Sequence, residues 1–225
     1  MPAAQVSVRR RARGRLSRAG ILAAALELVD QDGVGSLTMR RLAGRLDADP
    51  MSLYQHFQSK EALLDGLVGT LWSEVEVMDG DWQVVLPSLA NGIRRLAHVH
   101  PQAFRLVFGR GMLPLPALGP LDRALTALER AGLAREAAAE MVRTLLAYAG
   151  GWATLELSCD CGVDPGASQV EQVVAITRAL PAETPTHLLE VARLMACCDM
   201  DKQFELGLRL ILDGLAPRLV DARGR

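Results

Sequence analysis

The chain has 225 residues, half of them hydrophobic, and a formal net charge of −1. Ala and Leu dominate, whereas there are only four Phe, three Trp and two Tyr, which favours an all-α protein. The longest nearly uncharged run, residues 145–155, is shorter than the ~20 apolar residues that cross a bilayer. The basic N-terminus leads into no apolar stretch with a cleavage site. We therefore expect a soluble cytoplasmic protein, with no membrane segment.

Charge is divided unevenly along the chain. Residues 1–60 carry ten Lys and Arg against five Asp and Glu, whereas residues 61–225 carry fifteen against twenty-one. A basic front end joined to an acidic body indicates that only the front end meets a polyanion. Residues 1–15 hold five arginines and are predicted to be a disordered basic arm, either following DNA phosphates or remaining a solvated tail.

Apolar residues at helical spacing, interrupted by capping residues, Gly and Pro, predict a series of helices. The first four are predicted over 17–31, 38–46, 50–56 and 59–77. The later ones are predicted over 82–98, 101–110, 120–131, 135–157, 170–180, 186–196 and 201–219, with a Gly/Pro-rich connector over 111–120. The Asp79-Gly80 pair marks the expected boundary between an N-terminal three-helix domain over 16–78 and a helical domain over 79–225.

The stretch 36–60, SLTMRRLAGRLDADPMSLYQHFQSK, has the pattern of two short helices joined by a tight turn. Asp49 is a good N-cap, and Pro50 suits the first turn of a helix, where no N–H bond is lost. Leu53 and Phe57 would pack the second helix against its neighbours. This pattern predicts a helix-turn-helix over 38–57 that enters the major groove of DNA.

The run GVGSLTMRRLAGRLDADPMSLYQHFQSKEALLDGL resembles the DNA-binding domain of the tetracycline-repressor family of bacterial transcription factors. The run FELGLRLILDGL, residues 204–215, is similar to the last helix of that family's regulatory domain. The resemblance implies that Arg40 meets a guanine edge and that Tyr54 and Lys60 meet phosphates. The complete set of DNA contacts that it implies is Thr38, Arg40, Met51, Ser52, Tyr54, Gln55, His56 and Lys60.

Some of these residues also have a structural interpretation. Thr38 would cap a helix as well as hold a phosphate. His56 is either a contact or a spacer between two helices. Arg41 and Arg45 are either DNA contacts or solvated helix charges.

One helix-turn-helix reads too few base pairs to be specific. Two units that lie one helical turn apart, ~34–36 Å, read a pseudo-palindromic operator, so we expect a homodimer. Two apolar stripes, on the helices at 135–157 and 201–219, suit a four-helix interface. The predicted interface residues are Met141, Leu145, Phe204, Leu208, Ile211 and Leu215. An intramolecular core is the alternative that periodicity cannot exclude.

Aromatic and soft side chains gather in the second half of the chain, with two histidines nearby. As a set they suggest an apolar pocket for a small-molecule effector of unknown identity, whereas each residue alone is equally consistent with core packing. The candidates are Trp82, His98, His100, Phe104, Phe108, Met112, Tyr148 and Trp152.

Four cysteines, Cys159, Cys161, Cys197 and Cys198, fit no standard zinc module, which favours free thiols over a metal or redox sensor. There is no Ser/His/Asp set, glycine-rich phosphate loop or carboxylate pair on one helix face, so we expect no enzyme activity, no metal and no cofactor. The predicted function is a DNA-binding transcriptional regulator, in the first instance a repressor released by a small apolar ligand. An activator, a regulator controlled by a protein partner and, more remotely, a helical enzyme are the alternatives.

Overall fold

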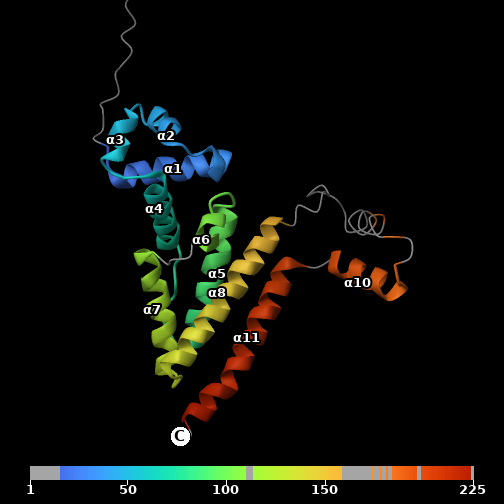
Figure 1. The fold of residues 1–225 in the computed structure, drawn as a ribbon. Helices are drawn as coiled ribbons and strands as arrows, with labels where there is room; N and C mark the ends of the chain where they lie inside the picture. The colour runs from blue at the N-terminus through green and yellow to red at the C-terminus, as the bar shows by residue number, and fades with distance from the viewer. Residues whose placement is uncertain are drawn as a thin grey trace, which may run out of the picture. The chain divides into compact units, whose positions relative to one another are not determined.

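The computed structural model of the chain describes residues 16–109, 114–158, 174, 178, 181, 184–196 and 199–223. Within these ranges all regular structure is helical, which confirms the predicted all-α class (Figure 1). The first helices are α1 (Arg18–Asp32), the 3₁₀ turn η1 (Val34–Ser36), α2 (Met39–Arg45), α3 (Pro50–Tyr54), α4 (Lys60–Ser73) and α5 (Trp82–Val99). They are followed by α6 (Arg105–Gly109), α7 (Leu115–Arg130), α8 (Arg135–Ser158), α10 (Thr186–Ala196) and α11 (Met200–Arg223). None of the helices in these ranges is apolar over a length sufficient to cross a membrane.

The chain forms two compact units, residues 1–67 and 68–225, which divide within α4. The division at residue 79 remains a prediction for the domain boundary.

In the first unit the helix starts are fixed by side-chain caps. The Gly20 N–H donates to Ser17 Oγ at 3.1 Å, and the Met51 N–H donates to Asp49 Oδ1 at 2.7 Å. These caps hold amides that have no partner within a helix, as the sequence predicted. The apolar faces of the four helices then form one core, which includes Ile21, Ala25, Leu28, Val29, Leu37, Leu42, Leu53, Phe57, Leu63 and Leu67.

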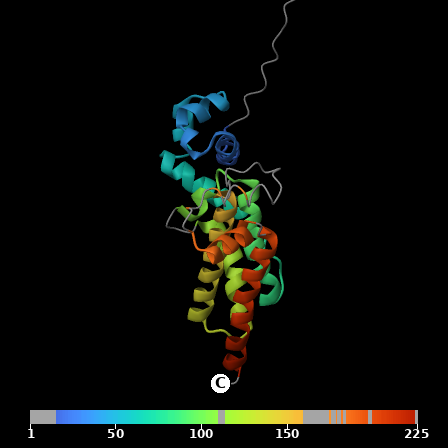
Figure 2. The same ribbon diagram turned by 90° about the vertical axis from the view of Figure 1, so that its right-hand side faces the viewer.

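In the second unit α5, α7 and α8 pack against one another, and α11 lies along α8 and α5 (Figures 1 and 2). Large apolar side chains from each helix fill the space between them, among them Leu86, Leu89, Ile93, Phe104, Leu121, Leu128, Leu145, Phe204 and Leu208.

The predicted ends of two helices were wrong. Helix α4 ends at Ser73 and not at residue 77, because Val75 and Val77 are buried while Glu74 and Glu76 are exposed, the alternation of an extended segment. Helix α7 begins at Leu115, within the predicted connector 111–120. Pro116 fits its first turn, and Pro120 is tolerated inside the helix.

Other boundaries differ less. Helix α6 begins at Arg105, after turns over 101–104, and α11 begins one residue earlier than predicted and runs to Arg223. The predicted arm over 1–15 lies outside the described residues, as does the predicted helix over 170–180 apart from residues 174 and 178.

Candidate nucleic-acid interface

Helix α3 has one buried face and one exposed face. Leu53 is fully buried, and Phe57, which follows the helix, is nearly so, confirming both as core residues. On the other side Met51 is 70% exposed, and Tyr54 and Gln55 are exposed as well. A large apolar side chain standing in water next to polar groups is the pattern of a contact surface.

The turn between α2 and α3 sets the direction of α3. Asp47 has a φ of 49°, the left-handed conformation that a residue after a helix often adopts. The Ala48 N–H donates to the Ala43 carbonyl at 2.9 Å, which closes α2. Asp49 then caps α3, with Pro50 in its first turn. Four residues, 46–49, therefore separate the two helices of the motif and fix their angle.

The three arginines of α2 differ in their partners. Arg41 Nη2 lies 2.6 Å from Asp32 Oδ2, and Arg45 Nη2 lies 2.9 Å from Glu27 Oε2, so both are paired with α1. Arg40 is exposed, and its guanidinium has no hydrogen bond or ion pair with the described residues. The structure thus supports the solvated-charge interpretation for Arg41 and Arg45 and leaves Arg40 available.

Thr38 is the N-cap of α2. The Arg41 N–H donates to Thr38 Oγ1 at 3.1 Å, and the residue is exposed. A hydroxyl at an open helix N-terminus is in a position to serve a bound phosphate too, because the first amides of the helix point outward.

The end of α3 is attached to α1. Arg18 Nη1 donates to the His56 carbonyl at 2.9 Å, and its guanidinium lies 4.1 Å from the centre of the Phe57 ring. His56 and Ser52 are only partly exposed. Arg18 was absent from the predicted site, although its place at the start of α1, three residues after Arg15, was visible in the sequence.

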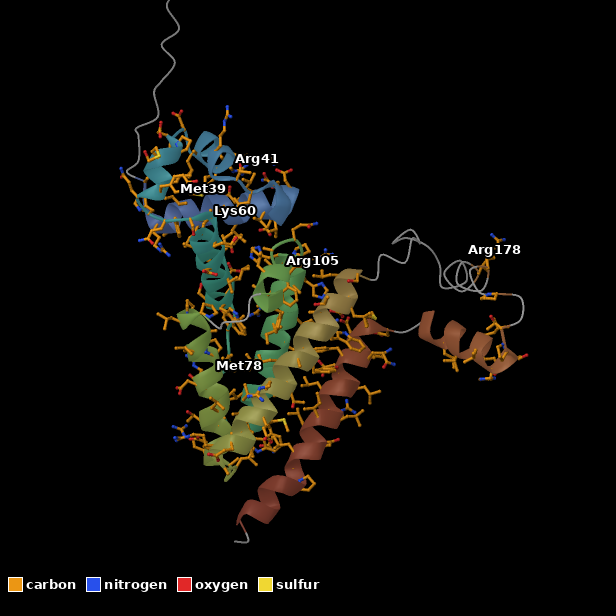
Figure 3. All side chains as sticks on the ribbon, in the orientation of Figure 1. Met39, Arg41, Lys60, Met78, Arg105 and Arg178 are labelled. Atoms are coloured by element: carbon orange, nitrogen blue, oxygen red, sulfur yellow. The ribbon has the colours of Figure 1, made fainter. Side chains whose placement is uncertain are left out.

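Lys60 is the first residue of α4 and is exposed (Figure 3). The Ala62 N–H donates to Ser59 Oγ at 3.1 Å, so Ser59 caps this helix. A cation at a helix N-terminus is unfavourable, since the helix dipole is positive there. A phosphate at that end would be attracted by the dipole and by Lys60 together.

Two family patterns match this sequence. Residues 21–67 match the bacterial regulatory proteins of the tetR family, and residues 76–219 match the tetracyclin repressor-like C-terminal domain. The chain belongs to the tetR family. It is therefore a DNA-binding transcriptional regulator and not an enzyme.

Individual relatives align with most of the length of this tetR-family protein. It is 30% identical to the tetracycline repressor protein class A from transposon 1721 of Escherichia coli, over 90% of this chain and 92% of that protein. It is 26% identical to the transcriptional repressor DrrR1 of Streptomyces coeruleorubidus, over 91% of this chain and 78% of that protein. The structure of ActR from Streptomyces coelicolor in complex with actinorhodin is 28% identical, with a TM-score of 0.78 over 92% of this chain and 99% of ActR.

Seven of the eight predicted pocket residues of this tetR-family regulator are among the described residues, and their contacts fall into four groups. Trp82 lines a groove between α5 and α11, and His100 Nε2 lies 2.9 Å from Glu74 Oε2. Phe104 and Phe108 pack together with ring centres 5.5 Å apart. The fourth group is His98, Tyr148 and Trp152, which lie around Glu156 and Phe204, and Met112 lies outside the described residues.

A buried charged cluster joins α5, α8 and α11 and was missed by sequence reasoning. Arg94 Nε donates to both carboxylate oxygens of Glu156, at 3.0 and 2.9 Å, and its Nη2 donates to Asp201 at 2.5 Å. His98 Nε2 lies 3.1 Å from Glu156, and Trp152 Nε1 donates to Glu156 at 3.1 Å. The side chains of Arg94 and Glu156 are only 14% and 6% exposed.

Electrostatics in this cluster favour the ionised pair. Burial raises the pKa of Glu156, but the hydrogen bonds and charge of Arg94, with smaller effects from Trp152 and His98, outweigh it and hold the pKa below its ordinary value. The hydrogen bond to Glu156 raises the pKa of Arg94. Burial raises the pKa of Tyr148, whose hydroxyl donates to the Phe204 carbonyl at 2.6 Å.

The predicted interface residues divide by burial. Within a single chain Leu145, Phe204, Leu208 and Leu215 are buried, whereas Met141 and Ile211 are half-buried. Near the end of α8 the Glu156 side chain is only 6% exposed, whereas Leu155 is 49% exposed. The exposed apolar side chains on α8 and α11 are therefore other residues, Leu155, Leu206 and Leu210.

All four cysteines lie outside the described residues. In the part of the chain that the structure describes, no group of three or more His, Cys, Asp or Glu could hold a metal ion.

Proposed function

We propose that this protein is a homodimeric repressor that binds a pseudo-palindromic operator through α3 and leaves it when the second unit binds a small apolar effector. The observation that carries the DNA half is the difference among the arginines of α2. Arg41 and Arg45 are paired with α1, whereas Arg40 stands exposed and has no partner among the described residues.

The relatives support repression and a small effector. Two of them are repressors by name, and ActR is known in complex with actinorhodin. A cytoplasmic location is part of this proposal, and the likeness to bacterial repressors supports it.

In this proposal the contacts divide into two kinds. Arg40, Met51, Ser52, Gln55 and His56 face the edges of bases, where Arg40 pairs with a guanine and the Met51 thioether meets an apolar edge such as a thymine methyl. The remaining contacts, Thr38, Tyr54 and Lys60, hold phosphates and set the register of the protein on the duplex.

The dimer in this proposal forms through α8 and α11. Leu155, Leu206 and Leu210 expose apolar surface on these two helices, which soluble monomers rarely do in one place. Met141 and Ile211 add their exposed sides. The other predicted interface residues are buried within each chain and support the interface from beneath, namely Leu145, Phe204, Leu208 and Leu215.

Gel-shift titrations in rising salt test the DNA half, with an operator selected from random duplexes by the wild-type protein. Arg40→Ala should weaken specific binding by ~5- to 150-fold, because an arginine–guanine pair contributes ~1–3 kcal/mol of discrimination. Lys60→Ala should weaken binding to all sequences alike and lower the salt slope by about one. Arg41→Ala is the matched control and should change specific binding least. Undiminished specific binding by both Arg40→Ala and Lys60→Ala would contradict the proposal.

A further inference from the structure

A cleft of about 370 Å³ lies within the second unit, between the end of α4 and the start of α7. Residues 72–73 and 75–77 form one wall, and Pro116, Gly119, Pro120 and Arg123 form the other. Next to the cleft the two helices almost touch, because a Cβ on Gly69 would lie 3.4 Å from Pro116 Cγ. The cleft is therefore bounded by packed helices and is large enough for a molecule of two or three fused rings.

Trp72 gives this cleft an unused hydrogen-bond donor. The side chain lines the cleft and is only 1% exposed. Its indole Nε1 is buried and has no hydrogen-bond partner among the described residues. Buried donors nearly always have an acceptor, and an unpaired one costs free energy that a Phe at the same place would avoid. The indole N–H therefore lacks an acceptor, and an oxygen on a molecule in the cleft would supply one.

The charges around the cleft favour a neutral occupant. Arg123 Nη1 donates to the Val77 carbonyl at 2.5 Å and lies 3.8 Å from the carboxylate of Asp79. Glu76 adds a second negative charge to the wall. Glu76 is itself paired, because Arg95 Nη2 lies 3.6 Å from Glu76 Oε2. Two cations are thus matched by two anions, which leaves little attraction for an ion of either sign. The rest of the wall is apolar, with Val75, Val77 and two prolines.

We propose that this cleft binds the effector, and that the effector is a neutral aromatic molecule whose carbonyl oxygen accepts a hydrogen bond from Trp72 Nε1. That the bound molecule is an effector rests on the proposed function. The binding site itself is inferred from the cleft, the unpaired indole N–H and the balance of charge. Because Trp72 lies on α4, which begins at the DNA-contacting Lys60, an occupant would act directly on that helix.

The experiment uses 9-fluorenone as the probe and the full-length protein with isotope-labelled tryptophan. Three tryptophans give three indole N–H signals in the NMR spectrum, and Trp72→Phe assigns one of them. Fluorenone should shift the Trp72 signal and leave those of Trp82 and Trp152 in place. Fluorene, which has the same shape without the oxygen, and fluorene-9-carboxylate, which carries a charge, should each bind at least about tenfold more weakly, the effect of ~1.4 kcal/mol.

Two variants show whether a lost signal reflects the cleft itself and not a failure to fold. Gly119→Leu fills the cleft from α7, where a Cβ meets no atom within 4 Å, and should abolish the shift while leaving Trp72 intact. Trp72→Phe should fold normally and lose the preference for fluorenone over fluorene. Equal binding of the two probes, or a shift at Trp82 or Trp152 instead, would overturn the site.

Operator binding separates the two proposals. Fluorenone should weaken operator binding by the wild-type protein and not by Gly119→Leu. Binding at Trp72 without any effect on the operator would overturn the effector assignment. If the wild-type protein without fluorenone selects no operator, the proposed function is wrong. The NMR measurement of the indole signals contains no DNA and would still decide whether the cleft binds fluorenone.

Discussion

The two units of this protein treat charge in opposite ways. In the first unit Arg40 and Lys60 stand in solvent without partners among the described residues, while the core beneath them is entirely apolar. In the second unit Arg94 is enclosed with Glu156 and linked to three helices. Unpaired cations are ready for an external polyanion, whereas a buried pair holds helices in one arrangement. Arg40 is thus available to an external ligand, whereas Arg94 holds helices together.

The largest effect should come from breaking the buried pair. Arg94→Met leaves the Glu156 carboxylate buried without its main partner and should lower the free energy of unfolding by ~3–5 kcal/mol, measured by urea denaturation. Glu156→Leu should have a similar effect. The double variant Arg94→Met/Glu156→Leu should recover most of the loss, since no unpaired charge remains. If the double variant is as unstable as either single variant, the unpaired buried charge is not the cause of the lost stability.

Asp201 is the control for this prediction. Its side chain is 83% exposed although it also contacts Arg94. Asp201→Asn should cost less than about 1 kcal/mol, because solvent screens an exposed ion pair.

A second prediction concerns two adjacent glycines of α8. A Cβ on Gly150 would lie 2.6 Å from Phe108 Cζ, whereas a Cβ on Gly151 would meet nothing within 4 Å. Gly150→Ala should therefore gain less stability than Gly151→Ala, because the end of the Phe108 side chain, which is 43% exposed, must move aside. Gly151→Ala should stabilise the protein by roughly 0.5–1 kcal/mol, since alanine suits a helix better. Thermal unfolding of the two variants measures the difference, and equal melting temperatures would contradict the close contact with Phe108.

Acid should weaken the second unit through Glu156. The pKa of Glu156 is depressed in the folded protein, so its stabilising contribution is present above the ordinary value of about 4.3 and is lost as pH falls through the folded pKa. Urea midpoints of the wild type should fall over this range. The urea midpoints of Arg94→Met/Glu156→Leu should fall less. An identical acid profile for the wild type and the double variant would contradict the role of Glu156.

The smallest effect should come from the turn between α2 and α3. Asp47 occupies the left-handed conformation, which glycine adopts without strain. Asp47→Gly should raise the stability by less than about 1 kcal/mol, because the more flexible unfolded chain offsets part of the gain. Asp47→Ala is the matched control and should lower the melting temperature. A loss of stability in both variants would point to a role for the carboxylate instead.

Local signals made the first unit predictable from the sequence. Ser17, Asp49 and Ser59 each cap the helix that they were expected to start, and Leu53 and Phe57 are buried as expected. Capping residues and short-range periodicity act over a few positions, so a single sequence reveals them. The separate roles of Arg40 and Arg41 were not predictable, because they depend on where Asp32 lies in space.

The second unit was less predictable because its contacts join distant positions. Arg94 and Glu156 are 62 residues apart, and nothing local in the sequence pairs them. One signal was available, since Glu156 follows Tyr148 and Trp152 at intervals of four along the same face of α8. The start of α7 was missed because Pro116 and Pro120 resemble a connector, although a proline in a first turn is also a helix signal.

The exposure of Met51 also makes the DNA-binding face sensitive to oxidants. Its thioether stands 70% exposed on α3, whereas Met39 on α2 is only 7% exposed. Peroxide would convert Met51 to the sulfoxide, replacing an apolar surface with a polar and chiral one at a proposed contact with bases. The fold would be unchanged, since Met51 contributes little to the core. A preparation aged in air should therefore lose operator affinity while its melting temperature stays the same, and Met51→Leu should resist that ageing.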